Sequence, residues 1–146
     1  MTVDYYKKAL NKCDIMALEC FYQDTPVLKY EIEFTPQLYK LRESISATVS
    51  NSWVKAKKKI SLETEDSYIG YKSFFHSFRI AYYGIQIARF GKIIEYDAKN
   101  DIWNWIKVAI SQNLSLDEII SELKPKLNYM MTEFRNVAPK LGNIDV

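Results

Sequence analysis

The sequence predicts a mostly α-helical, bundle-like single domain over residues 1–146, with one or two short β-strands. A length of 146 residues suits one domain built around one core. Only four glycines and four prolines occur, which argues against a turn-rich all-β fold. Apolar residues recur at helical spacing along most of the chain, and a single segment alternates as a strand does.

Two short helices are expected at the start of the chain. Thr2 can cap a helix over residues 3–12, because its side-chain oxygen can accept a free backbone N–H of the first turn. Asp14 can cap a second helix in the same way, and Pro26 ends this region.

The strand signal lies in VLKYEIEF, residues 27–34, where apolar and charged side chains alternate strictly. One strand cannot form a sheet, so this segment needs a partner. We expect the partner to be KIIEY, residues 92–96, or a strand of another chain.

A third helix is expected from Thr35, because a capping side chain is followed by Pro36 at the first helical position. Serine and threonine compete for backbone hydrogen bonds, so we expect a break within SATVSNS, residues 46–52. The helix then resumes at Trp53.

The second half of the chain reads as three more helices. The polar residues 61–67 separate the third helix from a long one that Asp66 or Ser67 can cap and that Gly91 can end. Another helix follows over residues 101–110.

Ser115 then starts a last helix, with Glu118 at the spacing of a capping box. Pro125 lies inside that helix, where it predicts a kink or a division into two shorter helices. An extended tail follows over residues 138–146.

Composition favours a cytoplasmic protein without a metal or cofactor. The net charge of +2 is too small to indicate a polyanionic partner by itself. We expect no signal peptide at the start, and no run approaches the roughly 18 apolar residues of a membrane span. Cys13 and Cys20 cannot build a disulfide framework, and with a single histidine in the sequence they make a poor zinc site.

A polar stripe runs along the long helix. At 100° per residue its members fall within an arc of about 80°; they are Lys72, His76, Arg79, Tyr83 and Gln86. The rest of this helix is apolar almost all round. Two permanent cations and an imidazole without a carboxylate suit a phosphate-like anion. The alternative is a structural role, in which the stripe is the solvent-facing edge of a core helix and its long polar side chains reach solvent.

Four stretches carry a family resemblance. They are ALNKCDIMALECFY with Glu19, YIGYKSFFHSFRIAYYGIQIARFGKI with Lys72, His76, Arg79, Gly84 and Gly91, then WNWIKVAISQNLSLDEIISEL and APKLGNIDV. Their order resembles the C-terminal helical part of predicted nucleotidyltransferases of the DNA polymerase β superfamily. The resemblance implies that the polar stripe holds a nucleotide or an acceptor.

The catalytic features of that superfamily are missing from the sequence. Its enzymes use a glycine-serine pair and two alternating aspartates to hold divalent metals, and neither motif occurs here. Glu31 and Glu33 alternate on the expected strand but lack the glycine turn, so we assign them no metal. We therefore expect a non-catalytic, nucleotide- or acceptor-binding part of a split or truncated nucleotidyltransferase. The alternative is a stand-alone interaction protein that binds and inhibits a protein or nucleic-acid partner.

Two further groups of residues are candidates for contacts with partners. A lysine run follows Trp53 and can track the backbone of RNA or DNA, or form a solvated helix face; it consists of Lys55, Lys57, Lys58 and Lys59. Trp103 and Trp105 place apolar surface on two sides of one helix, of which one side can pack in the core. We expect the other side to contact a second copy in a homodimer or a catalytic partner chain.

Overall fold

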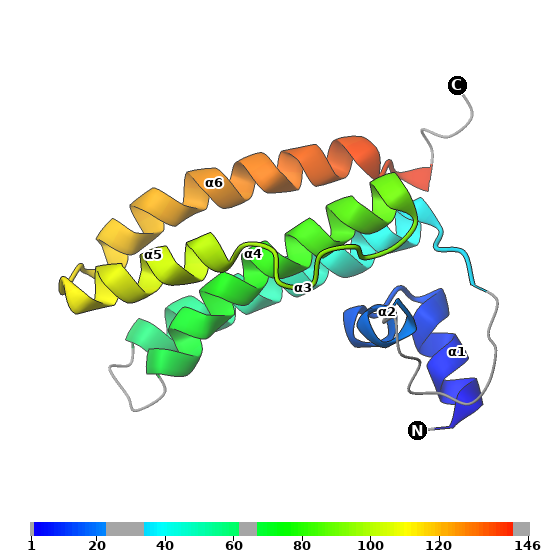
Figure 1. The fold of residues 1–146 in the computed structure, drawn as a ribbon, viewed down its shortest axis with the longest axis horizontal. Helices are drawn as coiled ribbons and strands as arrows, with labels where there is room; N and C mark the ends of the chain where they lie inside the picture. The colour runs from blue at the N-terminus through cyan, green and yellow to red at the C-terminus, as the bar shows by residue number, and fades with distance from the viewer. Residues whose placement is uncertain (1, 23–33, 62–66, 142–146) are drawn as a thin grey trace.

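The computed structural model describes residues 2–22, 34–61 and 67–141. This part of the chain forms six helices, drawn in Figure 1. They are α1 (Val3–Asn11), α2 (Ile15–Phe21), α3 (Leu38–Ser61), α4 (Ser67–Phe90), α5 (Asn100–Ser111) and α6 (Leu116–Val137). The prediction of a helical bundle is confirmed. None of the described helices is long and apolar enough to cross a membrane.

The long antiparallel helices α3 and α4 form the centre of the bundle, and α6 packs along them (Figure 1). Trp53 of α3 contacts Phe74 of α4 with ring centroids 4.5 Å apart. Where α6 crosses α4, a side chain on Gly84 would place its Cβ only 2.8 Å from the ring of Phe134. Glycine at this position therefore allows α4 to approach α6 closely.

Helix α3 runs unbroken through residues 46–52, so the predicted break is wrong. The Thr48 hydroxyl donates to the Ser44 carbonyl one turn earlier at 2.8 Å, so it is satisfied within the helix. Ile45, Val49 and Trp53 are buried at helical spacing and hold this stretch against the core. The helix begins at Leu38, two residues later than a cap at Thr35 predicts.

Helix α6 is one element, so of the two outcomes predicted at Pro125 the division into shorter helices is wrong, and a kink stays a prediction. Ser115 and Glu118 form the predicted capping box, with both of its hydrogen bonds present. Pro125 is exposed, and so is Ser121, whose carbonyl loses its helical partner at the proline. Buried residues on both sides of the proline, Leu123 and Leu127, keep the helix packed as a unit.

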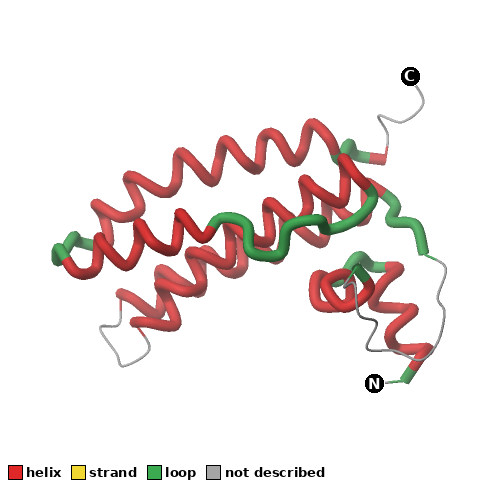
Figure 2. The backbone as a smooth tube through the Cα atoms, in the orientation of Figure 1, coloured by secondary structure: helices red, strands yellow, loops and turns green. Residues whose placement is uncertain are grey.

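The chain reverses after α4 and runs back along the same helix, as the loop in Figure 2 shows. Gly91 permits the turn, because its φ of +74° favours glycine. The following segment, residues 92–99, was expected to contain a strand over 92–96 but forms none. Most of the other predicted strand, residues 27–33, lies outside the described residues, and Phe34 is not in a strand.

The side chain of Gln86 holds this returning segment, residues 92–99, in the absence of a strand partner. Its side-chain Oε1 accepts the backbone N–H groups of Ile94 (2.9 Å) and Glu95 (2.7 Å). Its Nε2 donates to the Glu95 carbonyl at 3.1 Å. One buried amide therefore supplies the donor and acceptors that a neighbouring strand would otherwise supply.

The short helices α1 and α2 begin at their predicted caps and dock beside the start of α3 (Figure 1). The Ser44 hydroxyl of α3 donates to the Cys13 carbonyl at 2.6 Å. The Tyr96 hydroxyl of the returning segment donates to the Glu19 carbonyl at 3.0 Å. These two bonds join the N-terminal pair to the bundle and bring Glu19 towards α4.

Candidate anion-binding site

The polar stripe of α4 divides into a covered part and an open part. Tyr83 and Gln86 are 3% and 2% exposed, because the returning segment lies over them. The Tyr83 hydroxyl donates to the Tyr96 carbonyl at 2.7 Å, and the Gln86 amide holds residues 94 and 95. Both side chains are used in hydrogen bonds within the fold, so Tyr83 and Gln86 are not part of the proposed anion site.

Lys72 and His76 form the open part of the stripe, and both are exposed. The Lys72 ammonium lies 5.5 Å from the ring centroid of Tyr68. Partial burial of the imidazole disfavours its charged form and so lowers the pKa of His76. The positive charges of Arg79, Lys72 and Lys55 lower this pKa further. The surface around His76 is therefore electropositive, with cations from both α3 and α4.

Arg79 lies at the boundary between the two parts. Its guanidinium stacks over the Phe75 ring at 4.5 Å, and its Nη2 donates to Asn100 Oδ1 at 3.1 Å. The Nε of Arg79 is buried and has no hydrogen-bond acceptor among the described residues. A guanidinium that is oriented on two sides and keeps an unused donor is suited to an anionic ligand.

Glu19 reaches this boundary from α2. Burial raises the pKa of its carboxyl group, and the positive charge of Arg79 opposes that rise. The hydroxyl of Tyr22, close by in the chain, is buried without a hydrogen-bond partner among the described residues. The residue types of α2 do not predict this approach to Arg79, although the family resemblance singles out Glu19.

Aromatic rings of α4 and α5 contact one another beside the open part. Trp103 is half-buried and contacts Tyr68 and Phe75, with ring centroids 5.8 and 5.7 Å apart. Trp105 is also half-buried, with the Lys126 ammonium 5.8 Å from its ring. Part of each tryptophan is thus used within the bundle, and the interface expected at Trp103 and Trp105 stays a prediction.

The lysine run of α3 does not form one patch. Lys55 lies close enough to His76 to lower its pKa, whereas Lys57 lines a cavity between α3 and α6 with Lys124. Lys58 is exposed, and Lys59 is half-buried. Lys55 is therefore the residue of the run whose charge reaches the stripe at His76.

No cluster of three metal-ligating side chains occurs in the described ranges, and Glu31 and Glu33 lie outside them. Comparison with known protein families, with curated proteins and with solved structures finds no match. The resemblance to nucleotidyltransferases therefore rests on the four sequence stretches alone.

Proposed function

We propose that this chain binds the phosphate groups of a nucleotide at Lys72, His76 and Arg79, without catalysing a reaction by itself. The observation that carries the proposal is the guanidinium of Arg79, which Phe75 and Asn100 orient and whose Nε has no acceptor among the described residues, beside two exposed basic side chains. An anion bound at the exposed part of the guanidinium would relieve the repulsion among the neighbouring cations.

The geometry fits phosphate better than a neutral ligand. Arg79 presents a planar fork held by Phe75 and Asn100, while Lys72 adds a mobile point charge. His76 can become a further donor, because a nearby phosphate favours its protonated form. Tyr68, which is 57% exposed, offers a flat surface next to Lys72 on which a base can stack.

The resemblance gives this binding a role. In that reading the chain is the helical part of a nucleotidyltransferase and presents a nucleotide or an acceptor to a catalytic partner chain. The metal-binding aspartates would then belong to the partner. Assembly as a homodimer, or with such a partner through Trp103 and Trp105, belongs to the same proposal.

Substitution of Arg79 tests the site. Binding of ATP to the purified chain is measured by calorimetry, and each variant is also checked by its melting temperature. A charge-assisted contact is worth about 1.5–3 kcal/mol, so Arg79→Ala should weaken ATP binding roughly ten- to a hundredfold. Arg89→Ala is the matched control, because it removes the same charge from the same helix beyond the stripe, where Arg89 pairs with Glu133 at 2.7 Å.

Arg79→Lys separates the role of charge from that of shape, since lysine keeps the charge but loses the fork. We expect it to bind ATP less well than the wild type and better than Arg79→Ala. Unchanged affinity in Arg79→Ala, with a lowered melting temperature, would mean that the stripe is structural only.

A second candidate is a stand-alone protein that binds and inhibits a nucleic acid or another protein. Exposed Tyr68 and the nearby Lys55 favour single-stranded nucleic acid among these partners. A labelled oligonucleotide that binds much more tightly than ATP, with a steep dependence on salt and a loss in Lys55→Ala, would favour this candidate over nucleotide binding.

A further inference from the structure

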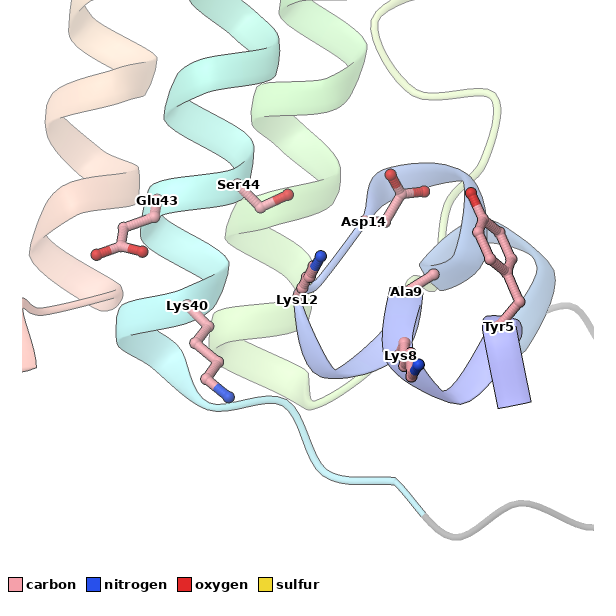
Figure 3. Close-up of a pocket in the computed structure, with 8 residues that line it drawn as sticks. All are labelled: Tyr5, Lys8, Ala9, Lys12, Asp14, Lys40, Glu43 and Ser44. Atoms are coloured by element: carbon pink, nitrogen blue, oxygen red, sulfur yellow. The ribbon is translucent and has the colours of Figure 1, made fainter. Parts of the chain in front are cut away.

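A separate cavity of about 600 Å³ opens between α1 and the first turns of α3 (Figure 3). Its walls include Lys8 and Lys12 from the end of α1, and Lys40 and Ser44 from α3. None of its lining residues belongs to the polar stripe of α4. This cavity is therefore a different place from the site proposed above.

Three lysines line this cavity, and none makes an ion pair with a carboxylate of the described residues. Lys8 lies in α1 and Lys12 is its C-cap, whereas Lys40 comes from α3, 28 residues further along the chain than Lys12. The tertiary fold, not a local run of lysines, brings them together. Grouping like charges opposes folding, and because the three lysines outnumber the two carboxylates, Asp14 and Glu43, the lining carries a net positive charge.

The two carboxylates in the lining form no ion pair with the lysines among the described residues. Asp14 Oδ1 accepts the backbone N–H groups of Met16 and Ala17 at 3.1 and 3.3 Å, so it is engaged as the cap of α2. The Glu43 side chain points away from Lys12 and Lys40 (Figure 3). Glu43 also lines a second cavity, which contains Arg42 and Lys140.

Helix electrostatics account for two of the lysines but not for the third. Lys8 and Lys12 lie at the carboxyl end of α1, where a cation stabilises the helix dipole. Lys40 lies in the first turn of α3, which contains no acidic residue. A cation there faces the positive end of the dipole and is unfavourable for the helix. An anion bound in the cavity would be attracted both by Lys40 and by this end of α3.

We propose that this cavity binds an oligophosphate, meaning two or more linked phosphate groups, either free or attached to a nucleoside. Three lysines from two helices match the several negative charges of such a chain, and each ammonium acts as a point charge with rotatable donors. Tyr5, which is 65% exposed at the rim, can cover the base of a nucleotide. The proposal stands independently of the function assigned to Lys72, His76 and Arg79.

Calorimetric titration of the full chain with sodium tripolyphosphate tests this proposal. The titration is run at fixed ionic strength in the wild type and in Arg79→Ala, so that binding at the stripe is weakened in the second series. Lys40→Ala should weaken the binding that remains in Arg79→Ala by roughly tenfold or more. Lys7→Ala is the matched control, because Lys7 is exposed on α1 beside Lys8 but does not line the cavity.

Each outcome supports or overturns the proposal. Retained binding with Lys7→Ala and lost binding with Lys40→Ala supports it. No binding of tripolyphosphate in Arg79→Ala, or equal losses in Lys7→Ala and Lys40→Ala, overturns it while leaving the stripe untouched. If Lys40→Ala does not melt like the wild type, Lys40→Gln takes its place. Tighter binding of ATP than of tripolyphosphate, lost in Tyr5→Ala, identifies a nucleotide; equal binding identifies a free oligophosphate.

Discussion

Arg79 and Gln86 lie two helical turns apart on one face of α4, yet their surroundings give them different roles. Gln86 is 2% exposed and makes three hydrogen bonds to residues 94 and 95. Arg79 keeps a buried donor without an acceptor in the described part of the chain. The spacing of the stripe places both residues on the same face correctly. It cannot tell which of them the returning segment will cover, because that segment's path depends on contacts distant in sequence.

Replacement of Gln86 should destabilise the fold. Gln86→Met keeps the length of the side chain but leaves the N–H groups of Ile94 and Glu95 and the Glu95 carbonyl without their partner. Water can reach part of this segment, so we expect a loss of roughly 2 kcal/mol. For a chain of this length that lowers the melting temperature by about 4–8 °C.

Gln112→Met is the control for that measurement, because Gln112 is exposed at the end of α5. Equal melting temperatures for Gln86→Met and the wild type would show that the returning segment is held by other contacts.

Anion binding should be coupled to protonation of His76. Its lowered pKa keeps the imidazole mostly neutral at pH 7 in the free protein. A phosphate bound beside it would raise that pKa, so binding should take up as much as one proton. Affinity should then rise as the pH falls from about 7 to 6, by at most tenfold for one proton per pH unit. Calorimetry in two buffers of different ionisation enthalpy measures the uptake.

His76→Gln isolates the imidazole from the protonation of the phosphate itself, and this variant should show less proton uptake than the wild type. In the absence of ligand the sign is reversed. A folded-state pKa below the ordinary 6.5 means that the unfolded chain binds the proton more readily, so His76 favours folding above that pH and this contribution is lost on acidification. Identical proton uptake in the wild type and His76→Gln would remove His76 from the site.

At the scale of elements, most local signals were reliable, although the cap expected at Thr35 lies two residues too early for α3. The caps at Thr2, Asp14 and Ser115 and the stop at Gly91 each involve a side chain or a backbone angle within a few residues of the helix end. The predictions were wrong where a local signal competes with tertiary packing. The serine-rich part of α3 remains helical because Ile45, Val49 and Trp53 are buried in the core.

The segment 92–96 shows a different reason for failure. Its β-branched and aromatic residues favour extended backbone, which is the property that the strand prediction detected. A strand also needs a ladder of hydrogen bonds, and here a side-chain amide supplies the partner groups. No pattern within residues 92–96 can reveal that the partner is Gln86.

At the scale of the whole molecule, both candidate anion sites depend on how α1 and α2 meet the bundle. The docked pair places Glu19 within electrostatic reach of Arg79 and forms one wall of the cavity that contains Lys40. The sequence predicts the two helices but not this arrangement, because the residues that join them to the bundle are scattered. Ser44 and Tyr96 carry no periodic signal and lie far from their acceptors in the chain.

Loss of the Ser44 hydroxyl should loosen this docking. Ser44→Ala removes the donor to the Cys13 carbonyl, at a cost of about 1 kcal/mol. Hydrogen exchange should then become faster in residues 3–21, while the amides in the centre of α3 and α4 keep their protection. Thr48→Ala is the control, since its hydroxyl bonds only within α3. Unchanged exchange in Ser44→Ala would show that apolar packing alone holds the pair.

Both of these connecting bonds end on main-chain carbonyls, at Cys13 and Glu19. Every amino acid carries that carbonyl, so substitution at either position preserves the acceptor. The outward residues of α2, such as Met16 and Cys20, are exposed and touch neither bond. The exposed residues of α2 can therefore be substituted or labelled, for instance with a fluorescent reporter at Cys20. The backbone would still place residue 19 beside Arg79.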